Sequence, residues 1–262
     1  MKRILSFLSC FFLLMPSAFA VPTGRQAGWN KTRWSQLQSG LEYSNFKVPV
    51  DNLGFANLHA FRIDPKYFTL RVFQANPKEK LGESVDEIVK ASPALIAVNG
   101  GFFTEEHRSL GLLIDQGKIL NRIHNTSWWS IFTISKTGTA RIFSPKLYAE
   151  SNNQLDFAVQ AGPRLVISGE IPEFRDFYAD RTALGITTDG KIVLVVTEGS
   201  GLLLQQLAQV FSEDENRGGL NCLDAMALDG GSSSQLYTHL PNFKAHVTSA
   251  ATVTNAVAVV PR

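Results

Sequence analysis

The sequence has 262 residues, of which 44% are hydrophobic, 25 are basic and 23 are acidic. This composition can bury a sizeable core, and the length allows one large domain or two small ones. The near balance of charges excludes the electropositive footprint of a nucleic-acid-binding protein, so we expect no nucleic-acid partner.

The first twenty residues have the organisation of a signal peptide. Lys2 and Arg3 precede an apolar run over residues 4–15, which is shorter than the about 20 residues that a membrane-spanning helix needs. Ala18-Phe19-Ala20 then gives the small-x-small pattern that a signal peptidase cleaves. We therefore predict a signal peptide over residues 1–20, a periplasmic or secreted bacterial protein, and no membrane anchor after cleavage.

Removal of this leader changes both the charge and the cysteine count. The leader holds Lys2, Arg3 and no acidic residue, so 23 basic and 23 acidic residues remain. A neutral protein exerts no long-range attraction on an anionic substrate, so any phosphate must be held by local contacts. Cys10 leaves with the leader, and Cys222 is then alone, which indicates a buried structural cysteine. Because a single cysteine cannot form an internal disulfide, the mature chain fits a bacterial periplasm better than a eukaryotic secretory route.

The mature chain begins with a polar and aromatic segment, residues 21–54, that leads into the domain proper. Residues 58–63 and 67–73 each alternate between apolar and polar side chains, and Asp64-Pro65 lies between them. This pattern predicts two strands separated by a turn.

A short helix and a buried strand are predicted next. Ser84 can cap a helix over residues 84–91, because Glu87 stands three residues later as in a capping box. Residues 94–98 form a continuous apolar run, which is typical of a strand covered on both faces.

Hairpins dominate the rest of the chain. The Asp189-Gly190 pair between two apolar runs is a strong hairpin signal. The best helix covers residues 202–211, with apolar side chains on one face. The remaining predicted strands cover residues 111–114, 118–121, 129–135, 139–143, 182–187, 192–197, 225–228 and 253–260. Many hairpins and few helices predict an α+β fold with a mixed, mainly antiparallel sheet, as a single domain over residues 55–262.

Two of these strands end in a polar residue that is followed directly by two glycines. One ends in Asn99-Gly100-Gly101 and the other in Asp229-Gly230-Gly231. Glycine pairs allow close approach of a ligand to the backbone, and their exposed N–H groups can hold an anion. A single pair would more simply be a tight turn, whereas two such strand ends favour one shared site.

Asp229 is the best acid candidate, because the rim of an apolar strand is a place where burial can shift a pKa. A carboxylate that caps the following turn is nearly as good an explanation. Ser232 and Ser233 could donate hydrogen bonds to a phosphate or a sugar, and they could equally cap a short helix. Glu198, at the end of another apolar run, is a candidate second carboxylate for glycoside hydrolysis, or an exposed loop residue.

Further polar residues could contact a substrate. Arg181, followed by Thr182, suits bidentate contact with a phosphate, although it could also pair with Asp180 or Asp176. Gln160, two residues before Gly162, could bind a sugar hydroxyl. The five histidines show no zinc-ligand spacing. No cofactor is required by the sequence, although a divalent cation could bind beside Asp229 and Glu198.

In their order along the chain, these motifs resemble the phosphodiester glycosidase family. The resemblance covers most of residues 55–262 and rests on the stretches 97–103, 159–163, 181–185, 201–210, 227–233 and 255–257. It implies hydrolysis of the bond between a sugar's anomeric carbon and a phosphodiester, in envelope or exopolysaccharide glycans. It also implies that Asn99, Arg181, Asp229, Ser232 and Asn255 line the site, with Asp229 as acid/base and Arg181 with the Gly230 and Gly231 amides holding phosphate.

Two alternatives stay open. A glycan-binding protein without catalytic activity could use the same cleft. A serine-type hydrolase is a weaker alternative, because the Gly-x-Ser-x-Gly pattern is absent and neither His239 nor His246 has an evident orienting partner.

Overall fold

The computed structural model describes residues 29–262 except 77, 79–80, 150–153 and 176. The predicted signal peptide and Asp176 therefore lie outside the described residues. No helix among the described residues is both long enough and apolar enough to cross a bilayer.

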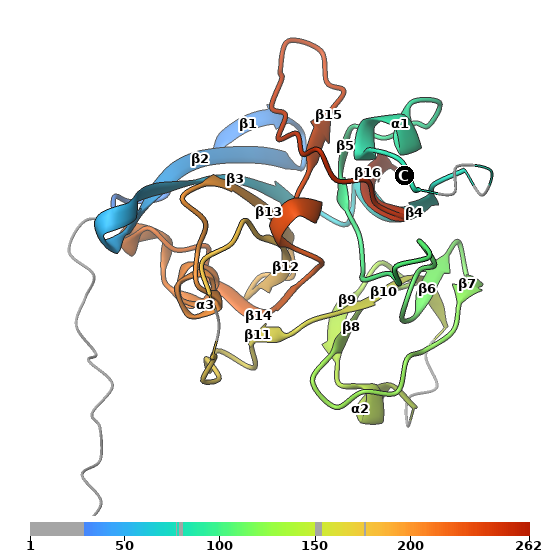
Figure 1. The fold of residues 1–262 in the computed structure, drawn as a ribbon. Helices are drawn as coiled ribbons and strands as arrows, with labels where there is room; N and C mark the ends of the chain where they lie inside the picture. Colours follow the sequence, from blue (N-terminus) through green and yellow to red (C-terminus); the bar gives the residue numbers. More distant parts are fainter. Residues whose placement is uncertain (1–28, 77, 79–80, 150–153, 176) are drawn as a thin grey trace, which may run out of the picture.

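A seven-stranded sheet occupies the left half of the molecule in Figure 1. The lead-in segment supplies its first two strands and so belongs to the sheet. In spatial order the sheet contains β1 (Ser35–Gln38), β2 (Leu41–Val50), β3 (Gly54–Ile63), β13 (Ile192–Gly199), β12 (Thr182–Thr187), β14 (Cys222–Ala227) and β11 (Arg164–Val166).

Two smaller sheets form the other half, the four-stranded one above and the five-stranded one below in Figure 1. The four-stranded sheet contains β15 (Leu236–Thr238), β5 (Ile96–Asn99), β16 (Asn255–Pro261) and β4 (Phe68–Gln74). The five-stranded sheet contains β7 (Lys118–Asn121), β6 (Leu113–Asp115), β10 (Leu155–Ala161), β8 (Ser130–Ser135) and β9 (Ala140–Phe143).

Every strand pair between the described residues of these sheets is antiparallel, so the predicted mixed sheet is replaced by three antiparallel ones. The strands around Asp64-Pro65 exist, but β3 and β4 belong to different sheets. The turn therefore carries the chain from one sheet to the next and does not close a hairpin.

Three short α-helices accompany the sheets in the described part of the chain: α1 (Val85–Val89), α2 (Pro145–Ala149) and α3 (Leu204–Ser212). The capping box of α1 is confirmed, because the Glu87 carboxylate accepts hydrogen bonds from the N–H and the hydroxyl of Ser84. Single turns of 3-10 helix also occur at η1 (Asp51–Leu53), η2 (Glu215–Arg217) and η3 (Gly231–Ser233).

The main hydrophobic core lies where the three sheets face one another. It takes Phe61 from the seven-stranded sheet, Val257 from the four-stranded sheet and Phe157 from the five-stranded sheet, all fully buried. A second core lies between the opposite face of the seven-stranded sheet and α3, where the free Cys222 is buried. Both faces of the central strands are therefore covered, which explains why β13 and β14 read as apolar runs.

Candidate functional site

The two glycine turns predicted from the sequence lie in contact with each other. Asn99, the last residue of β5, donates from Nδ2 to the carbonyl of Asp229, at 2.7 Å. The backbone N–H of Asp229 donates to the carbonyl of Gly100, at 3.1 Å. Strand ends from two sheets, 130 residues apart in the chain, thus form one polar junction at the margin of the main core.

Asn99 is the centre of this junction and is fully buried. Its Oδ1 accepts hydrogen bonds from the Thr182 hydroxyl, at 2.7 Å, and from the N–H of Gln235, at 3.2 Å. Together with the bond to Asp229, these contacts use both polar atoms of the amide. Asn99 therefore positions the surrounding segments and has little capacity left for a ligand.

Asn255, at the start of β16, holds the first glycine turn from the other side. Its Oδ1 accepts from the N–H of Gly101, at 2.9 Å, and its Nδ2 donates to the Ser109 hydroxyl, at 3.0 Å. A Cβ atom at Gly100 would lie 1.9 Å from this Oδ1, so any side chain there would clash. The glycine is required because the asparagine amide packs directly against the backbone.

Asp229 lies on the second turn, partly buried. Its carboxylate accepts from the N–H of Gly230, at 2.9 Å, and from the Ser233 hydroxyl. Burial raises the pKa of Asp229, and these two hydrogen bonds only partly oppose the shift. Gly231 follows with φ +62°, and Ser232 is exposed. The direction of the pKa shift of Asp229 is the one expected of a proton donor.

Arg181 borders the same turn, but its guanidinium is engaged elsewhere. Nε donates to the carbonyl of Leu202, at 2.9 Å, another nitrogen donates to the carbonyl of Phe177, and the group lies over the Phe177 ring. Its aliphatic stem approaches the turn, with Cδ 3.9 Å from where a Gly230 Cβ would be. A phosphate contact from Arg181 would require some of these carbonyl bonds to be exchanged.

Glu198 lies near the end of β13 in a hydrogen-bonded group that crosses three strands. Its Oε1 accepts from Asn57 Nδ2, at 2.9 Å, and from His59 Nε2, at 3.1 Å. The Tyr43 hydroxyl lies 2.8 Å from His59 Nδ1, and this arrangement assigns the imidazole proton to Nε2. Burial raises the pKa of Glu198, but the bonds from Asn57 and His59 outweigh it and leave the pKa below its usual value. Glu198 is therefore held ionised.

Asp180 connects the two carboxylates. Its carbonyl accepts from the N–H of Gly231, at 2.7 Å, which ties it to the Asp229 turn. Burial and the charge of Glu198 both raise the pKa of its carboxyl, and Arg181 opposes them. The Oδ1 atom is buried and has no hydrogen-bond partner among the described residues. Burial and the nearby charge of Glu198 thus disfavour the ionised form of Asp180, whose backbone holds the Asp229 turn.

Asp180→Asn should therefore stabilise the protein at about pH 7, because the folded state penalises the ionised carboxyl. A raised folded-state pKa means that this penalty is absent below the unfolded pKa and grows as the pH rises towards the folded pKa. The gain should accordingly shrink at about pH 4. Urea unfolding at both pH values measures it, and an equal or lower unfolding midpoint for the variant at about pH 7 would contradict the assignment.

Gln160 and Gly162 are used within the fold. Gln160 is fully buried, and its Oε1 accepts from the N–H groups of Leu112 and His124, at 2.9 and 2.8 Å. Its Nε2 donates to the carbonyl of His124, at 2.8 Å. Gly162 packs against the backbone of Trp128, 3.0 Å from where its Cβ would be. Gln160 braces the loop that faces the first glycine turn, and a sugar would have to displace one of these bonds.

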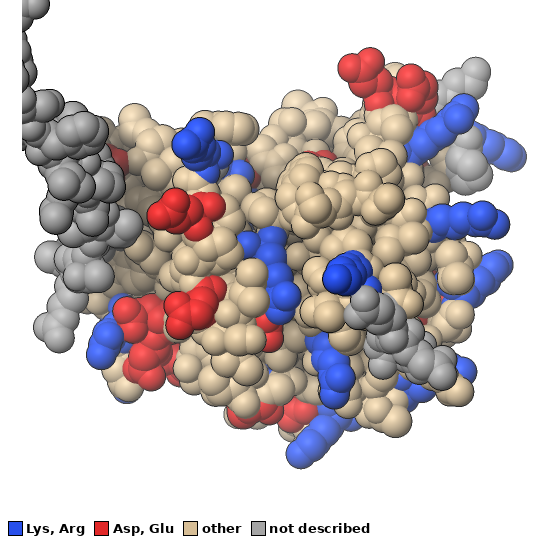
Figure 2. All heavy atoms as spheres, turned by 90° about the horizontal axis from the view of Figure 1, so that it is seen from below, with Lys and Arg blue, Asp and Glu red and all other residues tan. Residues whose placement is uncertain are grey.

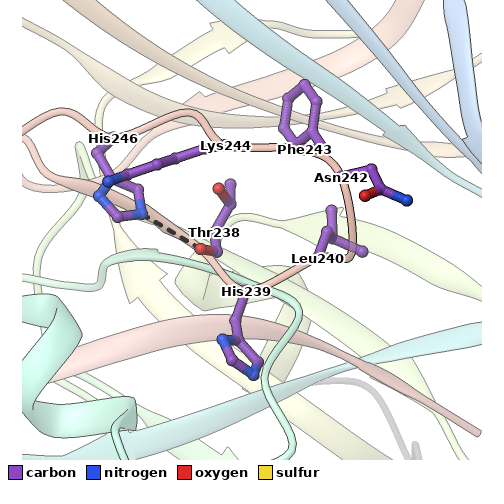
Figure 3. Close-up of a pocket in the computed structure, with 7 residues that line it drawn as sticks. All are labelled: Thr238, His239, Leu240, Asn242, Phe243, Lys244 and His246. Carbon is purple, nitrogen blue, oxygen red and sulfur yellow. Dashed lines mark hydrogen bonds between the residues drawn. The ribbon is translucent and has the colours of Figure 1, made fainter.

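A hollow of about 440 Å³ lies in the loop that follows β15. Figure 3 shows the His246 ring directed at Thr238, where Nε2 lies 3.2 Å from the carbonyl oxygen, while His239 points away on the other side of the loop. Phe243 packs edge-on against the Tyr43 ring, with centroids 4.7 Å apart. The hollow therefore borders the Glu198 group through Phe243 and Tyr43, but its basic side chains do not converge on one point.

Within the described residues, no group of three or more His, Cys, Asp or Glu side chains is arranged to hold a metal ion. Sequence reasoning did not single out Asn57, His59 and Tyr43, which surround Glu198, or Gln235, which contacts Asn99. A usable signal existed for the first two. Asn57 and His59 occupy alternate positions of a strand and lie on the same face as Phe61, a core residue. Two polar side chains on the core-facing side of a strand, at its end, are the signal.

Several known proteins are similar to this chain. The family model described as phosphodiester glycosidase matches residues 92–260. No curated protein sequence matches the chain. Among solved structures, the catalytic domain of zebrafish N-acetylglucosamine-1-phosphodiester alpha-N-acetylglucosaminidase, auto-inhibited by its pro-peptide, is similar with a TM-score of 0.65. It is 21% identical, over 90% of this chain and 89% of that one.

Two bacterial structures share the fold. A hypothetical protein from Synechocystis is 17% identical, over 88% of this chain and 64% of that one, with a TM-score of 0.62. A putative exported protein from Burkholderia pseudomallei is 12% identical, over 79% of this chain and 74% of that one, with a TM-score of 0.55. At these identities the likeness concerns the fold.

Proposed function

The chain belongs to the phosphodiester glycosidase family, and from this membership we propose that it hydrolyses the bond between the anomeric carbon of a sugar and a phosphodiester. The observation that carries the proposal is Asp229, a carboxyl with a raised pKa at the point where the two glycine turns meet. The zebrafish enzyme of similar fold acts, by its name, on an N-acetylglucosamine-1-phosphodiester, which supports this class of substrate.

In the proposed reaction, Asp229 is the proton donor and Glu198 is the second carboxylate. Water attacks the anomeric carbon, the bond from that carbon to the phosphate oxygen breaks, and the products are a free sugar and a phosphomonoester. Asp229 gives its proton to the departing phosphate oxygen, and Glu198, held ionised by Asn57 and His59, takes a proton from the water. Solvent then restores both groups.

Other residues position the reacting groups. Asn99 and Asn255 fix the two glycine turns, and Thr182 fixes Asn99. Phosphate is proposed to be held by the exposed Ser232 hydroxyl and by the Arg181 guanidinium, after exchange of its carbonyl partners. The N–H groups of Gly230 and Gly231 are proposed to join them after exchange of their bonds to the Asp229 carboxylate and the Asp180 carbonyl. Backbone N–H groups stabilise charge on a leaving phosphate without any proton transfer.

The proposed step needs no cofactor, and a divalent cation, if one binds, would do so beside Asp229 and Glu198. Export to the periplasm or the exterior, with glycans of the envelope or of an exopolysaccharide as substrates, is likewise proposed from the leader sequence.

Nucleic acid is not a proposed partner. On the face shown in Figure 2, basic side chains gather mainly over the half with the five-stranded sheet and acidic ones mainly over the other half.

Incubation of the mature protein with a panel of sugar-1-phosphodiesters tests the function directly. We expect release of free sugar and of a phosphomonoester from at least one member, and no release of inorganic phosphate. Binding of these ligands without turnover would instead support the glycan-binding alternative. Loss of activity after treatment with a serine-directed phosphonylating reagent would support the serine-hydrolase alternative.

A further inference from the structure

A cleft of about 800 Å³ runs along the outer edge of the seven-stranded sheet, away from the Asp229 turn. β1 pairs only with the first three residues of β2, so the edge of β2 from Ser44 onward has no strand partner among the described residues. The cleft lies over this open edge. Its walls come from residues 29–33, from β2, from Phe55 at the start of β3 and from Gly218.

The charged side chains that line the cleft are all basic: Lys31, Arg33 and Lys47. All three are exposed, and within the part of the chain that the structure describes, Arg33 and Lys47 form no ion pair. The cleft thus gathers three cations, two of them without an ion pair to a described residue, in a chain that is close to neutral as a whole. Such a cleft attracts anions locally, where the protein as a whole does not.

Aromatic and amide side chains lie among these cations. Phe55 is 57% exposed, and Trp29 and Phe46 are half-buried. Asn30 and Asn45 are exposed beside them. Flat apolar rings with neighbouring hydrogen-bonding groups suit sugar rings, which have an apolar face and a polar rim. The lining thus fits a ligand that is both a sugar and an anion.

The cleft is connected to the Glu198 group by the register of the sheet. Lys47 of β2 pairs with Asn57 of β3, and Asn57 pairs with Glu198 of β13. Directly paired residues place their side chains on the same face, so these three form one row across the sheet. Two strand spacings separate the backbones of Lys47 and Glu198 by about 10 Å, which a short run of sugar-phosphate units can span.

We propose that this cleft binds the continuation of a polymeric substrate, an anionic glycan whose sugars are joined by phosphodiesters. Lys47 and Arg33 contact its phosphates, and Phe55 contacts a sugar ring. The proposal rests on the proposed function, because it places the scissile unit at Asp229 and Glu198. It adds a second binding region, outside the reacting groups, for the rest of the glycan chain.

Isothermal titration with phosphomannan, and with the same mannan free of phosphate, tests this inference. Titrations use Asp229→Asn protein so that no ligand is consumed. We expect binding of phosphomannan only, weakened about tenfold by the combined Arg33→Gln and Lys47→Gln changes and by raised salt. Lys118→Gln, at an exposed lysine of the five-stranded sheet, is the matched control and should leave binding unchanged.

Equal binding of mannan and phosphomannan, or unchanged binding by the double variant, would overturn the inference. Polyphosphate that binds as tightly as phosphomannan would also overturn it, since the cleft would then select charge alone. The proposed function is judged separately, from sugar release by a small sugar-1-phosphodiester, for which the double variant with Asp229 intact should have wild-type kcat. Cleft-dependent binding without any such release would show that the cleft binds the polymer, but it would refute the proposed function and with it the claim that this polymer is a substrate.

Discussion

Asp229→Asn is expected to lower kcat by about 100-fold while the protein stays folded. Asparagine has nearly the same shape and can still accept the hydrogen bond from the N–H of Gly230, but it has no proton to give. The expected loss of kcat is at the lower end of the range for general acid catalysis, because phosphate is a good leaving group even without protonation. Steady-state kinetics with a sugar-1-phosphodiester measures it.

The leaving group provides a sharper test of the same assignment. If Asp229 protonates the departing oxygen, the loss in Asp229→Asn should shrink when an aryl ester, whose phosphate leaves more easily, replaces an alkyl ester. A loss of equal size for both esters would contradict the role as proton donor. Asp86→Asn, at an exposed aspartate in the first turn of α1, is the control and should keep full activity.

Stability separates a chemical effect from a structural one. The pKa of Asp229 is raised by burial, so the ionised carboxyl destabilises the folded state increasingly as the pH rises from the unfolded pKa towards the folded one. Asparagine removes that penalty. The variant should thus be at least as stable as the wild type at about pH 7, and an inactive variant that also unfolds more easily would not support a catalytic role.

Local signals in the sequence predicted many of the elements, although β1, β2, β10, β11, β15 and α2 were missed. The Asp189-Gly190 hairpin joins β12 and β13, and Ser84 and Glu87 cap α1. These features depend on neighbouring residues and so can be recognised without the fold. The place of β4 could not be recognised in this way, because its partner β16 lies at the far end of the chain and nothing near Asp64-Pro65 specifies that pairing.

In the site, too, local features could be predicted from the sequence and long-range contacts could not. The double glycines indicated that Asn99 and Asp229 belong to special turns, and the two turns do lie in contact. The partners of Gln160 and Arg181 could not be anticipated, since they are mostly backbone groups such as Leu112, His124 and Leu202. A polar side chain that hydrogen-bonds to a loop cannot be distinguished in the sequence from one that binds a ligand. Only the folded chain shows which of the two it is.

Asn99→Ala is expected to destabilise the fold by about 3 kcal/mol, because it leaves buried polar groups of Asp229 and Gln235 without their partner. Thr182→Val removes only one of the three bonds to Asn99 and should cost about 1 kcal/mol. Urea unfolding of the two variants gives both values.

Asn99→Asp separates the loss of a hydrogen bond from the loss of volume. It keeps the shape and the oxygen that accepts from Thr182, but it turns a second oxygen towards the carbonyl of Asp229, where Asn99 had a donor. Its cost should therefore match or exceed that of Asn99→Ala. If Asn99→Asp were as stable as the wild type, the amide would not be what joins the two turns. The Asp229 carboxyl would then owe its position to Gly230 and Ser233 alone.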